Sequence, residues 1–344
     1  MKPWRSGALR VGIALGTLAV VFVADGVVES VPVKSASMIS TPTKDVPTAY
    51  VASGPAGTVS VIDVDSRTVV ATVRAGDYPF ALALAPNGRT VYVTDFYSGK
   101  VCVIDTATDT VTKKVRVGSY PHGVAVSPNG EKVYVANNGS NTVSVIDTAT
   151  NKVSDTIPVG GEPSGVAVSP NGKTAYVTNF YSNTVSVIDT ASNRVKATIA
   201  VSKGPQGIAA SPNGETVYVT ELNSNTVSVI DVATNTVTAT VPLPSGSGPW
   251  DVALTPSGNT AYVTDTGAND VSVINTASNT VTSTVSAGSG PIDLAISPDH
   301  NTAYVSDVGS NEVSVIDTAD NTVTGTVAVG SGPQGVAIGN VPTG

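Results

Sequence analysis

A tyrosine recurs along this chain at an almost constant interval, and this interval constrains the fold more than any other feature of the sequence. Successive copies are 42 residues apart, except for one spacing of 44, and they stand at Tyr50, Tyr92, Tyr134, Tyr176, Tyr218, Tyr262 and Tyr304. A period of this length indicates one supersecondary unit that is repeated along the chain. The sequence therefore predicts a repeat architecture rather than a collection of unrelated elements.

One copy of the unit, residues 163–204, contains four runs of five to eight residues that are rich in Val, Thr, Ile and Tyr. Apolar and polar residues alternate within the runs, which is the pattern of half-buried β-strands. Pro170–Gly172 and Asp189–Asn193 separate successive runs and have the composition of tight turns. Four short antiparallel strands repeated at this spacing are typical of propeller blades.

We name the four strands of a unit A, B, C and D in chain order. Seven B strands carry the repeated Tyr, and seven A strands begin at a Pro. The first B, C and D strands, within residues 48–75, have no A strand before them, and the last A strand, at 336–338, has no partners after it. We therefore predict an all-β, seven-bladed β-propeller of four-stranded antiparallel blades, in which the last A strand completes the first blade and closes the ring.

The repeated segments resemble a known family. Ala175–Asn179 followed by Thr184–Asp189 looks like the YVTN family of β-propeller repeats, and the resemblance extends over residues 48–339. The family resembles surface-layer and other exported proteins, mostly without an assigned activity. The resemblance thus implies a fold more strongly than a function.

The N-terminal residues have the pattern of a secretory signal. Lys2, Arg5 and Arg10 precede the uncharged run Val11–Ala24, which is shorter than the roughly 20 apolar residues of a membrane-spanning helix. We predict a signal peptide at 1–24, a linker at 25–47 and the propeller at 48–344, and hence an exported protein, either secreted or associated with the cell envelope. An uncleaved N-terminal anchor is the alternative, and cleavage after Ala24 or after Ala36 remains open.

Charge is distributed unevenly along the chain. The net charge is −8, yet residues 204–344 hold twelve carboxylates and no Lys or Arg. Nucleic acid is excluded as a favourable partner for such a surface, whereas a cationic small molecule, a protein or a cell-wall polymer would suit it. The single cysteine, Cys102, stands where other C strands have Ser, so we expect a buried small side chain rather than a nucleophile.

Strand direction places the D–A and B–C loops on one face of the ring, which we call the top face. Every aromatic residue of the propeller outside the repeated Tyr falls in these loops or at the adjoining strand ends: Tyr78, Phe80, Phe96, Tyr97, Tyr120, Phe180, Tyr181 and Trp250. Aromatic residues gathered on one face suggest a binding surface. The alternative is that they only cover the ends of the blades.

The residue after the first Pro of each A strand is expected near the mouth of the central channel. These seven residues differ from one another, and they are Phe80, His122, Ser164, Gln206, Trp250, Ile292 and Gln334. The next residue is small in five blades and is Asp251 or Asp293 in the other two. From both patterns we predict the ligand-binding residues Phe80, Phe96, Tyr97, Tyr120, Phe180, Tyr181, Gln206 and Trp250.

A divalent cation site is a further prediction from the acidic half. Glu221, Asp251, Asp265 and Asp293 offer carboxylate oxygens, the ligands that Ca²⁺ or Mg²⁺ prefers, with no competing Lys or Arg after Lys203. The alternative for residues at the end of a B strand is that they only cap the following turn.

Two functions follow from these patterns. The first is an exported propeller that binds a ligand or protein partner through its top-face loops, without catalysis. The alternative is a divalent-metal-dependent lyase or lactonase at the channel mouth with His122 as general base, because streptogramin lyases and sugar lactonases are similar in architecture. The sequence holds no serine elbow, P-loop, zinc-spaced Cys/His set or dinucleotide fingerprint, and whether the protein is an enzyme is left open.

Overall fold

The structure, a computed structural model, describes residues 22–24, 27–29 and 45–343, and the chain divides into the units Met1–Thr43 and Lys44–Gly344. In the first unit, β1 (Phe22–Ala24) pairs antiparallel with β2 (Val27–Glu29). Most of the predicted signal peptide and linker lies outside the described residues. Within the described residues, no helix has the length and apolar character needed to cross a membrane.

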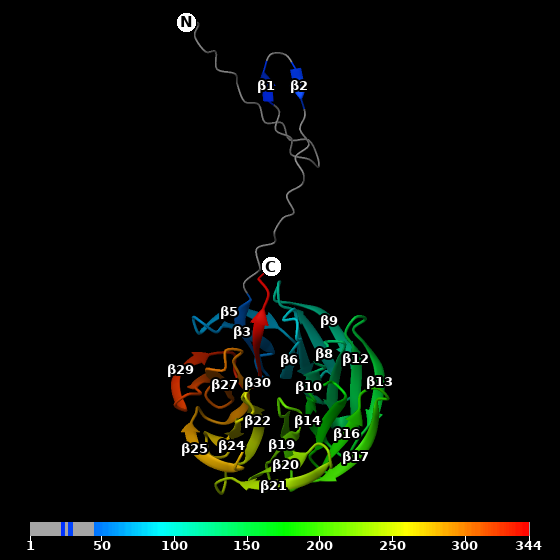
Figure 1. The fold of residues 1–344 in the computed structure, drawn as a ribbon, viewed down its shortest axis with the longest axis vertical. Helices are drawn as coiled ribbons and strands as arrows, with labels where there is room; N and C mark the ends of the chain where they lie inside the picture. Colours follow the sequence, from blue (N-terminus) through cyan, green and yellow to red (C-terminus); the bar gives the residue numbers. More distant parts are fainter. Residues whose placement is uncertain (1–21, 25–26, 30–44, 344) are drawn as a thin grey trace. The chain divides into compact units, whose positions relative to one another are not determined.

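The second unit is a ring of seven four-stranded antiparallel sheets, which confirms the predicted seven-bladed propeller (Figure 1). We number the blades along the chain and name the strands of each from the channel outward. The strands of blades 1 to 3 are β6 (Pro79–Leu84), β7 (Thr90–Asp95), β8 (Lys100–Asp105) and β9 (Thr110–Arg116); β10 (Pro121–Val126), β11 (Lys132–Asn137), β12 (Thr142–Asp147) and β13 (Lys152–Pro158); and β14 (Pro163–Val168), β15 (Thr174–Asn179), β16 (Thr184–Asp189) and β17 (Arg194–Ala200). Those of blades 4 to 6 are β18 (Pro205–Ala210), β19 (Thr216–Glu221), β20 (Thr226–Asp231) and β21 (Thr236–Pro242); β22 (Pro249–Leu254), β23 (Thr260–Asp265), β24 (Asp270–Asn275) and β25 (Thr280–Ser286); and β26 (Pro291–Ile296), β27 (Thr302–Asp307), β28 (Glu312–Asp317) and β29 (Thr322–Ala328). A short 3-10 helix, η1 (Asn138–Ser140), lies in the loop between β11 and β12.

Blade 7 is built from both ends of the propeller unit. The C-terminal strand β30 (Pro333–Val341) supplies its innermost strand, and β3 (Val46–Ser53), β4 (Thr58–Asp63) and β5 (Thr68–Arg74) supply the others. Figure 1 shows β3 and β30 side by side. Val46 pairs with Val341 and Pro47 with Asn340, so β3 begins two residues inside the segment predicted as linker. This pairing closes the ring and leaves no open end to the array of blades.

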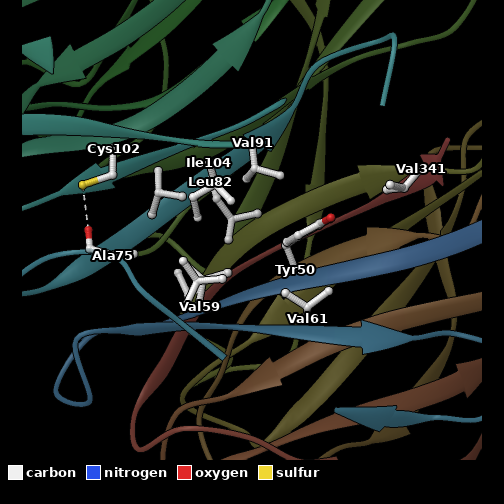
Figure 2. Packing of buried hydrophobic residues seen from close by; sticks show 12 residues of the cluster. Tyr50, Val59, Val61, Ala75, Leu82, Val91, Cys102, Ile104 and Val341 are labelled. Carbon is white, nitrogen blue, oxygen red and sulfur yellow. Dashed lines mark hydrogen bonds between the residues drawn. The ribbon is translucent and has the colours of Figure 1, made fainter. Parts of the chain in front are cut away.

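The hydrophobic core consists of seven layers, each lying between two neighbouring blades. The third strand of each blade is buried on both faces because other blades cover both faces of its sheet. In β12 (Thr142–Asp147), for example, four consecutive residues are buried. Figure 2 shows the layer between blades 7 and 1, where Val59 and Val61 pack with Leu82 and Ile104. The hydrophobic contribution to stability therefore comes mainly from contact between blades.

Cys102 belongs to this layer and confirms the prediction of a buried small side chain. It is fully buried, and its Sγ donates a hydrogen bond of 2.8 Å to the carbonyl oxygen of Ala75 (Figure 2). Burial raises the pKa of the Cys102 thiol to about 11. The group therefore stays protonated at neutral pH and lacks the thiolate character of a reactive cysteine.

Hydroxyl groups on the second strand link five of the seven blades to the next one. Thr220 Oγ1 donates to the carbonyl oxygen of Trp250 at 2.8 Å and accepts the amide hydrogen of Gly207 at 2.8 Å. Blades 1, 3, 5 and 6 make the same link to the next innermost strand through Thr94, Thr178, Thr264 and Ser306. These bonds fix the spacing between the strands that line the channel.

Candidate functional site

A cavity of about 200 Å³ occupies the top end of the central channel, where the seven innermost strands begin. It is lined by the residue that follows the first Pro of each innermost strand, as the repeat predicts for this position. These residues are Phe80, His122, Ser164, Gln206, Trp250, Ile292 and Gln334. Trp250 lies across the ring from Phe80 and His122, since two innermost strands separate it from either of them along the ring.

The next position is small in most blades because neighbouring innermost strands approach closely. A Cβ atom on Gly123 would lie 2.3 Å from the carbonyl oxygen of Ser164, and one on Gly207 would lie 2.7 Å from that of Trp250. Asp251 and Asp293 occupy this position in blades 5 and 6 and also line the cavity. They are the two places where the channel wall carries a carboxyl group.

The structure brings these two carboxyl groups together. They hydrogen-bond to each other, and Asp293 also accepts the amide hydrogens of Leu294 at 2.8 Å and of Val336, on the next innermost strand, at 2.9 Å. Burial, with the neighbouring Asp293 charge as a second cause, raises the pKa of Asp251 well above its usual value. Burial also raises the pKa of Asp293. Two carboxyl groups in this arrangement share a proton.

No Lys or Arg on the seven innermost strands faces this pair. Among the seven innermost strands, the only ionisable side chains are His122, Asp251 and Asp293. Burial lowers the pKa of His122 to about 4, so the imidazole is neutral at physiological pH. The cavity therefore carries negative charge, or a shared proton in its place, without a protein counterion.

A chain of hydrogen bonds crosses blades 2, 3 and 4 at the cavity wall. Ser164 Oγ donates to Gln206 Oε1 at 2.5 Å, and His122 Nδ1 lies 3.2 Å from Ser164 Oγ. Because the single hydroxyl hydrogen of Ser164 is used toward Gln206, the neutral imidazole donates its Nδ1–H to Ser164 and keeps Nε2 as an acceptor. Ser164 is thus oriented as a donor to an amide rather than as a nucleophile activated by His122.

Aromatic rings form a continuous group on the top face of blades 1 and 2. Phe96 is its centre, with ring centroids 5.1 Å from Tyr120, 5.3 Å from Tyr97 and 5.8 Å from Phe80. Tyr78 joins through Tyr97, and His122 lies 4.1 Å from Phe80. We call these six residues (Tyr78, Phe80, Phe96, Tyr97, Tyr120 and His122) the aromatic lip, because it runs from exposed loops to the cavity wall.

Tyr120 is held in the aromatic lip at a cost in backbone energy. Its φ is +50°, a left-handed conformation that side chains other than Gly, Asn and Asp seldom adopt. Blades 4 to 7 have Gly at the equivalent position, as at Gly204 and Gly248. The Tyr120 ring stacks on Phe96 at an interplanar angle of 24° and remains 48% exposed. Strain retained at an exposed aromatic residue is typical of functional surfaces.

Three of the predicted aromatic residues lie apart from the aromatic lip. Trp250 lines the cavity on the opposite side. Phe180 is half-buried next to Gly204, and Tyr181, which follows it, is 76% exposed. The predicted ligand-binding residues thus divide into the aromatic lip, the cavity wall at Gln206 and Trp250, and an outlying pair in the β15–β16 loop.

The predicted metal ligands are not all brought together. Glu221 is fully buried and binds its own blade, since Oε1 accepts the Ser202 amide at 2.8 Å and both oxygens accept hydroxyls, from Thr226 and Ser228. Asp265, at the equivalent position of blade 5, is also buried. Within the described part of the chain, no group of three or more His, Cys, Asp or Glu is placed to hold a metal ion. Asp251 and Asp293 are the two predicted ligands that meet.

Asp265 faces an acid that the sequence patterns above did not single out. It pairs across the strands with Asp270, and an oxygen of each carboxyl is buried without a hydrogen-bond partner among the described residues. Burial raises the pKa of Asp265 to about 7, and Asp270 contributes to the rise. A comparison of the repeats could have identified Asp270, because the equivalent residue is Thr in four other blades, as at Thr142 and Thr184.

Comparisons with known proteins agree with this architecture. The sequence profile of the YNCE-like β-propeller family matches residues 43–130 and 126–214, which together span half of the chain. No curated protein sequence matches significantly. The predicted YVTN and surface-layer type stays a prediction.

Solved structures of similar fold include three with clear overlap. Hydrazine synthase of Kuenenia stuttgartiensis is 25% identical, with 77% of this chain and 95% of that chain covered and a TM-score of 0.69. A protein of unknown function from Desulfotomaculum acetoxidans is 20% identical, with 85% of this chain and 98% of that chain covered and a TM-score of 0.73. A Bacteroides fragilis protein provisionally named 6-phosphogluconolactonase is 16% identical, with 87% of this chain and 99% of that chain covered and a TM-score of 0.74.

The matched repeats, the ring closed by β3 and β30, and these structural likenesses agree with one another. The chain therefore belongs to the YNCE-like β-propeller family.

Proposed function

We propose that this protein is an exported binding protein that captures a ligand or a protein partner at the top end of its central channel, without catalysis. The observation that carries the proposal is the meeting of the cavity wall and the aromatic lip at one end of the channel. Phe80 belongs to both, so an apolar group can extend from the exposed rings of Tyr97 and Tyr120 into the cavity. The charged run at Lys2–Arg10, followed by an apolar run, supports export.

A thermal-shift screen of small molecules, peptides and cell-wall fragments tests this proposal, because a ligand that binds only the folded state raises the melting temperature. Hits are then measured against Trp250→Ala and Tyr97→Ala. The control is Lys173→Ala, an exposed residue of the loop between β14 and β15 at the other end of the strands. Binding that is lost in the first two variants and kept in the control supports the site. Hits that bind all variants equally would refute it.

A divalent-metal-dependent lyase or lactonase is the second candidate. The observation that favours it is that His122, Asp251 and Asp293 line one cavity, and similar folds include the protein provisionally named 6-phosphogluconolactonase. His122, neutral and with Nε2 free to accept a proton, would act as general base. Ca²⁺ or Mg²⁺ at millimolar concentration should then raise the melting temperature, and EDTA should reverse the rise. An unchanged melting temperature would remove this candidate.

A further inference from the structure

The cavity presents polar atoms that have no protein hydrogen-bond partner, as well as apolar walls. Gln206 is 8% exposed, and its amide Nε2 has no hydrogen-bond partner among the described residues, because only Oε1 is engaged, by Ser164. Gln334 is 6% exposed, and its Oε1 likewise lacks a partner in the described part of the chain. Both residues line the cavity. These two amide atoms are therefore available to a ligand or to water inside the cavity.

The buried Asp251–Asp293 pair requires a positive charge or a proton between its two carboxyl groups. Two carboxyl groups buried together are destabilised unless a proton or a cation lies between them. The innermost strands that pack around the pair, β18, β22, β26 and β30, carry no ionisable side chain besides these two, and His122 on β10 is neutral. A cation that replaces the shared proton must therefore come from outside the channel wall.

Aromatic residues line other parts of the same cavity. Trp250 directly precedes Asp251, and Phe80 with His122 lies across the channel. The volume of about 200 Å³ is smaller than the roughly 300 Å³ lower bound of ordinary ligand pockets. It therefore suits a small molecule or the end of a larger one, with a charged group at one end and a flat apolar body at the other.

We propose that the cavity binds a small organic amine, with its ammonium group at Asp251 and Asp293 and its flat apolar part between Trp250 and the aromatic lip. The inference deepens the proposed binding function and rests on it. The ammonium group replaces the proton that the two carboxyls share, and Gln334 Oε1 is available as a further acceptor. The aromatic faces add cation–π and stacking contacts.

Matched probes test this directly on the full-length protein. In isothermal titration calorimetry, 2-phenylethylamine should bind and 2-phenylethanol, which has nearly the same shape without the charge, should bind about tenfold more weakly or not at all. Titrations in buffers of different ionisation enthalpy should show about one proton released per amine bound near pH 6. This measurement uses the wild-type protein and does not depend on any variant folding.

Asp251→Asn and Asp293→Asn should each weaken binding of the amine about tenfold or more, because a charge-assisted hydrogen bond is lost. The control Asp320→Asn removes the same charge from an exposed turn and should leave the affinity unchanged.

The inference would be overturned if the amine and the alcohol bound equally well. It would also be overturned if the Asp251→Asn and Asp293→Asn variants bound the amine with the affinity of the wild type and released the same number of protons. If the alcohol still binds and Trp250→Ala abolishes that binding, the amine inference fails and the proposed site survives. If neither probe binds, the amine inference fails while the thermal-shift screen still decides the proposed function.

Discussion

Asp251 and Asp293 hydrogen-bond to each other from adjacent innermost strands, at positions where five other blades have Gly or Ala. Each carboxyl group therefore stands at a position where the close approach of neighbouring innermost strands leaves little room for a side chain in the other blades. Asp293 also accepts a hydrogen bond from the backbone amide of Val336 in blade 7. Blades 5, 6 and 7 are thus joined at the channel by groups that titrate, and this has consequences for stability.

The free energy of unfolding should fall as the pH rises from about 4 to about 7. The pKa of Asp265 is about 7 and that of Asp307 about 6, both raised mainly by burial, and those of Asp251 and Asp293 are also raised. An unfolded Asp has a pKa of about 3.9, so in this window the folded state binds more protons, and each group contributes a slope of up to about 1.4 kcal/mol per pH unit. Urea unfolding at pH 4.5, 6 and 8 measures the effect. Stability that rises over this range would contradict these pKa shifts.

Asp265→Asn should stabilise the protein at pH 8 by about 1 kcal/mol, because it removes repulsion between cross-strand carboxylates. Two other blades show the favourable arrangement. Asn137 Nδ2 donates to Thr142 and Ser144, and Asn179 makes the same bonds. Urea unfolding at pH 8 is the measurement, with Asp317→Asn at the end of β28 as the control. A variant less stable than wild type at pH 8 would show that the Asp265 carboxylate is needed for the fold.

Thr220→Val should lower the free energy of unfolding by about 1–2 kcal/mol, since it removes a donor and an acceptor between innermost strands and leaves the Trp250 carbonyl without its partner. The control Thr238→Val removes a single, longer hydrogen bond on the outermost strand of the same blade and should cost less. Chemical denaturation of both variants decides the point. Equal losses would mean that the links between blades add nothing beyond an ordinary hydrogen bond.

Tyr120→Gly should leave stability unchanged or raise it by up to about 1 kcal/mol, because relief of the positive φ offsets the loss of the ring contact with Phe96. The same change should weaken capture of any ligand found in the screen. Glu162→Gly is the matched control, since Glu162 has φ +53° at the equivalent position of blade 3 without an aromatic ring. Thermal melting and ligand affinity are measured on both. A marked loss of stability in Tyr120→Gly alone would assign the ring to packing.

The repeat made the fold predictable in detail. Because each unit places equivalent residues at equivalent points of the ring, Phe80, His122 and Trp250 could be assigned to the channel from spacing alone. The same logic separates Asp251 from Glu221 once the register is known. Asp251 takes a slot that faces the channel, whereas Glu221 takes the place of Asn137 and Asn179, whose side chains bind their own blade.

Other features of the site could not be taken from the period. The pairing of Asp265 with Asp270 depends on cross-strand register, and the separation of Tyr181 from Tyr120 depends on the direction of each loop. The chain of hydrogen bonds from His122 to Gln206 depends on rotamers that no sequence pattern encodes. These are the places where the blades differ, so the repeat carries no information about them.

The most direct test of the binding site is a crystal structure of the protein grown with 2-phenylethylamine. We expect density for the amine in the channel cavity, with its nitrogen within hydrogen-bonding distance of the carboxyl oxygens of Asp251 and Asp293 and its ring against Trp250 or Phe80. Density for the amine elsewhere on the propeller, with the cavity holding only solvent, would contradict the account.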